Sequence, residues 1–168
     1  MGQDNRNKIL EIFYEYPNQR FTIREISKLA KIPRATSHKI ISDLKKEKLI
    51  TKDNIAETNL LFKTKKINFF IEKIVESGLI EEIVDKLNPS NIILFGSIRK
   101  GDSIKESDID IFVESTIKKD IDLIKFERRL GHKIQLFNEP QIKKLGSELG
   151  NNILNGIKLF ELKPMEIP

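Results

Sequence analysis

The chain has no cysteine and no tryptophan, and it has only two histidines. The absence of cysteine excludes disulfides and thiolate zinc sites, and two histidines are too few for an all-histidine metal site. No apolar run exceeds about five residues, whereas a membrane-spanning helix needs about 20. The first residues also lack the apolar core of a signal peptide. We therefore expect a soluble, cytoplasmic protein with no membrane partner.

Charge, by contrast, is abundant and unevenly distributed. Charged residues make up 33% of the 168 residues, and the net charge is +5. Residues 1–66 carry 15 Lys and Arg against 8 Asp and Glu, whereas residues 67–168 carry 15 against 17. A basic half joined to a slightly acidic half predicts that only the first half meets a polyanion such as nucleic acid. The alternative is that lysine only keeps a helical surface soluble.

The most informative segment begins at Asn91. The run Asn91–Phe95 predicts a short strand, and Gly96-Ser97 then predicts a tight turn into a short helix. Glycine lets the backbone come close to a ligand, and free N–H groups at a helix start attract phosphate. The hydroxyl of Ser97 adds a hydrogen-bond donor. This turn is therefore a candidate phosphate site.

Two aspartates follow in the stretch Ser107-Asp-Ile-Asp-Ile-Phe-Val113. The β-branched and aromatic residues favour a strand, on which Asp108 and Asp110 share one face. Two carboxylates on one face repel each other unless a cation lies between them. Mg²⁺ bound by carboxylates and substrate phosphates meets that need, so we predict a magnesium site beside the phosphate site.

These residues carry a family resemblance. Gly96-Ser97, Gly101 and Ser107-Asp108-Ile109-Asp110 resemble the signature of the minimal nucleotidyltransferases of the DNA polymerase β superfamily, over roughly residues 88 to 162. The resemblance implies that Asp108 and Asp110 hold Mg²⁺ and act as catalytic carboxylates. It also implies that a nucleoside triphosphate, with ATP favoured, binds to four residues of the turn: Gly96, Ser97, Lys100 and Gly101. Many relatives have arginine where Lys100 stands, and lysine keeps the positive charge.

One departure from the family pattern concerns catalysis. Active members carry a third carboxylate on the next strand, as general base or third metal ligand. Here that strand is predicted over residues 132–137, and Gln135 stands at the matching position. Glutamine cannot accept a proton near neutral pH, although Glu139 is a possible substitute from the following loop. The sequence therefore leaves open whether the site transfers a nucleotidyl group or only binds nucleotide.

The first half shows a different pattern. Apolar spacing and turn residues predict three helices followed by a β-hairpin. The predicted helices cover residues 4–16, 23–31 and 33–46, and the predicted strands cover residues 49–51 and 59–63. This order resembles winged helix-turn-helix regulators of the MarR, ArsR and TrmB-like kind, over roughly residues 5 to 66.

That resemblance implies double-stranded DNA as a partner, with the helix over residues 33–46 as the recognition helix. We expect Arg34 and Thr36 to reach base edges, while lysines contact phosphates. The lysines expected at the DNA backbone are Lys39, Lys45 and Lys52. Ser37 and His38 are expected on the same exposed face, with His38 solvated or beside phosphate. A winged helix used for protein contact is the alternative.

The remaining elements complete the predicted architecture. Residues 67–87 predict a helical connector that Gly78 splits, and its Phe69-Phe70 stripe is either the seam of a homodimer or ordinary packing. Further helices are predicted over residues 120–130 and 139–154, with a last strand over 157–162. The fold class is α+β, with a winged helix followed by a small mixed sheet covered by helices.

We therefore predict a DNA-binding domain over residues 1–66, a connector over 67–87 and a nucleotidyltransferase-like domain over 88–168. The predicted function is a DNA-binding regulator whose second domain binds nucleoside triphosphate and Mg²⁺, with or without nucleotidyl transfer. Two alternatives stay open. One is an inactive regulator that senses nucleotide, and the other is an antitoxin-type enzyme that modifies a protein partner.

Overall fold

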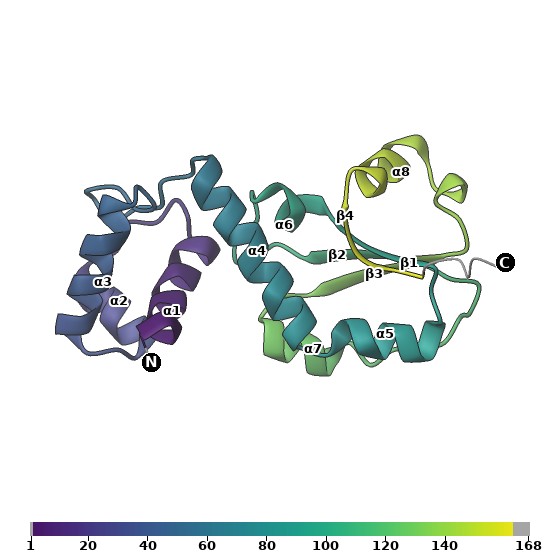
Figure 1. Ribbon diagram of the computed structural model, residues 1–168, viewed down its shortest axis with the longest axis horizontal. Coiled ribbons are helices and arrows are strands. Elements are labelled where there is room, and N and C mark those ends of the chain that lie inside the picture. Colours follow the sequence, from purple (N-terminus) through teal and green to yellow (C-terminus); the bar gives the residue numbers. More distant parts are fainter. Residues whose placement is uncertain (1, 163–168) are drawn as a thin grey trace, which may run out of the picture. The chain divides into compact units, whose positions relative to one another are not determined.

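The computed structural model describes residues 2–162 (Figure 1). The chain divides into two units. The first takes in the chain up to Lys66 together with Ser103–Lys105, and the second holds Ile67–Asp102 and the chain from Glu106 onward. Each unit has its own buried apolar residues, so each is described by itself.

Three helices form most of the first unit. They are α1 (Gly2–Glu15), α2 (Ile23–Ala30) and α3 (Arg34–Lys46), as the apolar spacing predicts. A capping box begins α2, because the Thr22 hydroxyl accepts from the Glu25 N–H and the Glu25 carboxylate accepts from the Thr22 N–H. Lys31 then adopts a left-handed conformation with φ of 55°, which ends α2 and turns the chain into α3.

The predicted β-hairpin after α3 is wrong. In the described part of the chain, residues 49–63 form one isolated bridge, between Ile50 and Ala56, and no strand. Helix α4 (Leu60–Glu76) begins where the second strand was predicted, because the Asn59 side chain accepts from the Phe62 N–H at 2.9 Å and caps it. Phe62 is buried against Tyr14. A short apolar run fits one turn of a helix as well as a strand, so the pattern of residues 59–63 does not distinguish the two.

A lysine near the middle of α4 is also buried in the first unit. Lys66 is 1% exposed, and its ammonium donates to the backbone oxygen of Ser103. The Lys105 N–H donates to the backbone oxygen of Glu15 at 2.9 Å, and their side chains form an ion pair at 3.6 Å. These contacts explain why Ser103–Lys105 belongs to the first unit.

A four-stranded sheet forms the centre of the second unit. Its strands are β1 (Asn91–Phe95), β2 (Ile109–Glu114), β3 (Ile134–Glu139) and β4 (Ile157–Glu161), in the order β3-β2-β1-β4. β2 and β3 are parallel, whereas β1 pairs antiparallel with both β2 and β4. The predicted mixed sheet is therefore confirmed.

Helices cover the sheet on both sides. α5 (Leu79–Leu87) and α7 (Ile124–Leu130) lie on one side, and α8 (Ser147–Leu154) lies on the other (Figure 1). Phe112 packs against Ile153 of α8. Because side chains alternate along a strand, Asp110 and Glu114 extend from the same face of β2 as Phe112. The acidic residues are therefore on the α8 side of the sheet.

Two predicted helices differ from the structure. The helix predicted over 120–130 begins only at Ile124. The helix predicted over 139–154 is broken into the 3₁₀ helix η1 (Ile142–Lys144) and α8, because Glu139 still pairs with Glu114 in the sheet and Pro140 follows it. The last strand, predicted over 157–162, is confirmed as β4.

The connector splits where the sequence predicts. Gly78 separates α4 from α5 with φ of 82°, a left-handed conformation. Phe70 is buried, and its ring meets that of His132 edge-on at 5.4 Å. This contact favours ordinary packing for Phe70, and the homodimer stays a prediction. No helix among residues 2–162 is long and apolar enough to cross a bilayer.

Candidate nucleotide and metal site

The turn after β1 comes into contact with the acidic pair. Helix α6 (Gly96–Lys100) begins at Gly96, where φ is +74°. A Cβ atom added to Gly96 would lie 1.9 Å from Oδ2 of Asp110 and 2.8 Å from its Cγ. The carboxylate therefore fills the space that any side chain at position 96 would need. Only glycine permits both this approach and this backbone conformation.

Asp110 lies between two strands as well as beside the turn. Its register partners are Phe95 on β1 and Gln135 on β3. Burial raises the pKa of Asp110, and the charge of Asp108 raises that pKa further. Both causes disfavour the charged form. A cation beside the two carboxylates would favour the charged form of Asp110 and so offset both the burial and the repulsion from Asp108.

Gln135 contacts the other aspartate. Its amide Nε2 donates to Oδ2 of Asp108 at 2.6 Å. Asp108 directly precedes β2, and Gln135 is the second residue of β3. The structure therefore brings Gln135 to the acidic pair, on the strand where the sequence places it.

The other residues of the turn follow Gly96 within about one and a half helical turns. Ser97 is half-buried, Lys100 is exposed and Gly101 is buried at the end of α6. The Asp102 N–H donates to the backbone oxygen of Ser97 at 3.0 Å, which closes the turn. Ser97 thus adjoins the contact between Gly96 and Asp110, whereas Lys100 extends from the far end of α6 into solvent.

Sequence reasoning missed a histidine that positions the acidic pair. His132 is buried, and its Nδ1 lies 2.7 Å from the backbone oxygen of Ser107. Phe70 packs against its ring. His132 therefore fixes the residue before Asp108. A single histidine before a strand has no spacing signal that would have revealed this role.

Two carboxylates suit one particular kind of metal. Among residues 2–162, no group of three or more His, Cys, Asp or Glu side chains could hold an ion. Mg²⁺ commonly binds one or two carboxylates and takes its remaining ligands from water and substrate phosphates. Asp108 and Asp110 therefore fit magnesium that arrives with a phosphate-bearing ligand, and they do not form a complete protein cage.

The sequence match decides the family of this domain. Residues 76–158 match the family model described as Nucleotidyltransferase domain. The chain contains a nucleotidyltransferase domain. The matched region includes the turn at Gly96, the acidic pair and Gln135. The comparison with curated proteins gave no match, and neither did the comparison with solved structures.

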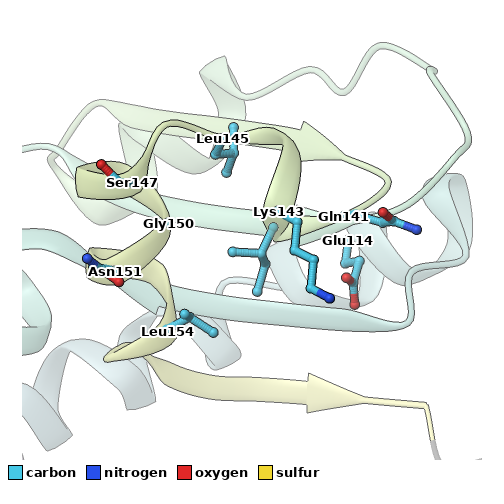
Figure 2. Close-up of a pocket in the computed structure, with 9 residues that line it drawn as sticks. Glu114, Gln141, Lys143, Leu145, Ser147, Gly150, Asn151 and Leu154 are labelled. Atoms are coloured by element: carbon cyan, nitrogen blue, oxygen red, sulfur yellow. The ribbon is translucent and has the colours of Figure 1, made fainter.

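A second feature of the nucleotidyltransferase domain lies at the other end of β2. A hollow of about 750 Å³ is lined by Glu114 and by eight residues between Gln141 and Leu154 (Figure 2). Glu114 accepts hydrogen bonds from Asn91 at 2.6 Å and Ser90 at 2.8 Å. Phe112 separates Glu114 from Asp110 along this face of β2. None of the predicted nucleotide or metal residues lines the hollow.

Outside the nucleotidyltransferase domain, most of the predicted DNA-binding residues are accessible. Arg34, His38 and Lys39 of α3 are exposed, as is Lys52, and Thr36 is half-buried.

Within α3, Lys45 is half-buried and Ser37 is fully buried. The half-buried Lys45 donates from its ammonium to the backbone oxygen of Lys52 at 2.9 Å. Ser37 was expected on the exposed face, and this is wrong. It is fully buried, because it shares the inner stripe of α3 with Ile41 and Leu44.

Proposed function

We propose that the nucleotidyltransferase domain binds a nucleoside triphosphate together with Mg²⁺, and that it does so without efficient nucleotidyl transfer. The observation that carries the proposal is the contact between Gly96 and Asp110, because it sets the phosphate turn and the acidic pair at one point. ATP is the nucleotide we favour for the first tests.

Each residue of the site has a proposed role. Bound magnesium supplies the positive charge that neutralises both the carboxylates and the phosphate oxygens. Asp108 and Asp110 would hold it. Gly96 leaves the backbone open to a phosphate, the Ser97 hydroxyl donates a hydrogen bond to it, and Lys100 adds a positive charge at the end of the turn.

Transfer requires more than this set of residues. An acceptor hydroxyl would attack the α-phosphorus, a new O–P bond would form, and pyrophosphate would leave as the bridging bond breaks. The hydroxyl proton needs a base to accept it, and the neutral amide of Gln135 is too weak a base near neutral pH. Glu139 is no substitute, because it pairs with Glu114, four residues along β3 from Gln135 and thus about 13 Å away.

The test compares binding with transfer. Full-length protein is incubated with Mg²⁺ and each of the four nucleoside triphosphates, labelled at the α-phosphate. We expect saturable, magnesium-dependent binding. We expect no transfer of the labelled nucleotidyl group to the protein or to added DNA. Label transferred at tens of turnovers would contradict the proposed lack of efficient transfer, although it would leave nucleotide binding intact. Label appearing only after a second protein is added would favour the antitoxin-type alternative.

For the first unit we propose binding to double-stranded DNA through α3. Support comes from the excess of seven basic residues in residues 1–66 and from the exposure of Arg34, His38, Lys39 and Lys52. The left-handed residue Lys31 between α2 and α3 suits a helix-turn-helix. The bridge between Ile50 and Ala56 would be a rudimentary wing, and Lys45 would support it from α3.

DNA binding should weaken steeply as salt rises, because phosphate contacts release counterions. Lys39→Ala should weaken binding to all sequences alike and reduce the slope of log affinity against log salt by about one. Arg34→Ala should instead relax base preference. Fluorescence anisotropy with labelled duplexes over a salt series measures both effects.

Lys119→Ala is the control, because it removes an exposed lysine from the other unit and should change neither the affinity for DNA nor the base preference. Equal losses for Lys119→Ala and Lys39→Ala would contradict the role of α3.

A further inference from the structure

Gln135 is the neutral member of a group of three polar side chains on one face of the sheet. The parallel pairing of β2 with β3 sets it opposite Asp110, and residues paired in this way extend from the same face. Its amide also donates to Asp108 at 2.6 Å. Because an ionised carboxylate only accepts hydrogen bonds, the amide must present its NH₂ group to Asp108.

The charge of this group limits what it can bind. Asp108 and Asp110 supply two negative charges, and Gln135 supplies none. No third His, Cys, Asp or Glu joins the pair to form a metal-binding group within residues 2–162. A second divalent cation close to the first would have to share the same two carboxylates, and the repulsion between two dications would then be offset by only two protein charges. The protein's own ligands therefore suffice for one cation that shares the phosphates of a nucleotide.

We propose that Gln135 restricts the nucleotide site to a single divalent cation by adding no charge beside the two carboxylates, while its hydrogen bond holds Asp108 in place. Gln135 is thus a positioning residue for Asp108. The inference rests on the proposed function, since it concerns the same site. It extends that function by stating how many cations accompany the nucleotide and which residue sets this number.

The hydrogen bond and the missing charge make separable contributions. The bond occupies one acceptor position of Asp108 and fixes the orientation of its carboxylate, which leaves the other positions for a cation. Because Gln135 is neutral, it does not act as a third anionic ligand beside Asp108 and Asp110. A variant that restores the charge and another that removes only the donor will therefore behave differently.

The experiment counts Mn²⁺ ions per bound nucleotide. Full-length protein with α,β-methylene-ATP, which resists transfer, is titrated with Mn²⁺, and bound metal is measured by electron paramagnetic resonance. We expect one Mn²⁺ per bound nucleotide in the wild type and two in Gln135→Asp. Gln141→Asp adds the same charge at an exposed glutamine of the same unit, so it should keep one.

Gln135→Leu tests the hydrogen bond alone. It removes the donor without adding charge, so the count should stay at one while the affinity for the nucleotide falls about five-fold. Thermal melting establishes that each variant is folded. If Gln135→Asp does not fold, Gln135→Glu adds the same charge at the same position and should bind two Mn²⁺ ions in its place.

The outcomes separate this inference from the function on which it rests. Two Mn²⁺ ions per nucleotide in the wild type would overturn the inference and leave nucleotide binding intact. A folded Gln135→Asp that still holds one ion would overturn the role of Gln135 in setting the number. A wild type that binds no nucleotide at any Mn²⁺ concentration would overturn the proposed function itself, and the inference with it.

Discussion

Gly96→Ala should abolish measurable nucleotide binding. The new methyl group would lie 1.9 Å from Oδ2 of Asp110, well inside van der Waals contact, so the carboxylate or the turn must move. Alanine at a φ of +74° also costs about 1–2 kcal/mol in backbone strain. We expect the affinity for magnesium-bound ATP to fall at least about 100-fold, or roughly 2.7 kcal/mol, measured by isothermal titration calorimetry.

Gly78→Ala is the matched control for this substitution. Gly78 has a similar φ of 82°, but a Cβ atom there would meet nothing within 4 Å. Both variants should therefore lose a similar amount of stability from backbone strain, and only Gly96→Ala should lose the nucleotide. If both bind ATP equally well, the contact between Gly96 and Asp110 is not part of a nucleotide site. If both fail to bind, general destabilisation explains the result.

The sequence predicts the second unit well, because several independent signals agree there. The run Asn91–Phe95 is bounded by Pro89 and Gly96, and Gly78 and Gly131 end helices whose apolar spacing is regular. In the first unit, by contrast, the sequence signals do not determine the structure of every segment. Residues 59–63 have no periodicity of their own, and the cap at Asn59 together with the burial of Phe62 decides for a helix.

The residues of the candidate site also fall into two groups: those that local sequence spacing indicates, and those whose role depends on how the strands pair. The spacing of Gly96, Asp108 and Asp110 is local in sequence, and a strand places the two aspartates on one face by geometry alone. The roles of Gln135 and His132 depend instead on which strands are neighbours and in what register. The sequence indicates a strand around each of them, but the bond from Gln135 to Asp108 needs the parallel register of β2 and β3.

Asp110→Asn should remove metal-dependent nucleotide binding and, without metal, should make the protein more resistant to heat at neutral pH. Burial, and then the charge of Asp108, raise the pKa of Asp110. A carboxyl whose pKa is higher in the folded than in the unfolded chain stabilises most below its unfolded pKa, and this contribution is lost as pH rises through the folded pKa. Above that range the charged Asp110 weakens the fold, and asparagine removes the repulsion.

The two effects of this substitution have opposite signs, which makes the result difficult to explain by misfolding. Without metal, the melting temperature of Asp110→Asn should exceed that of the wild type at pH 8, and the difference should vanish near pH 3, where Asp110 is protonated. Magnesium with ATP should raise the melting temperature of the wild type and leave the variant unchanged. Asp120→Asn, at an exposed position, should match the wild type in every condition. A variant less stable than the wild type at pH 8 would mean that the carboxylate of Asp110 is held by favourable contacts, and magnesium would then not be needed to offset its charge.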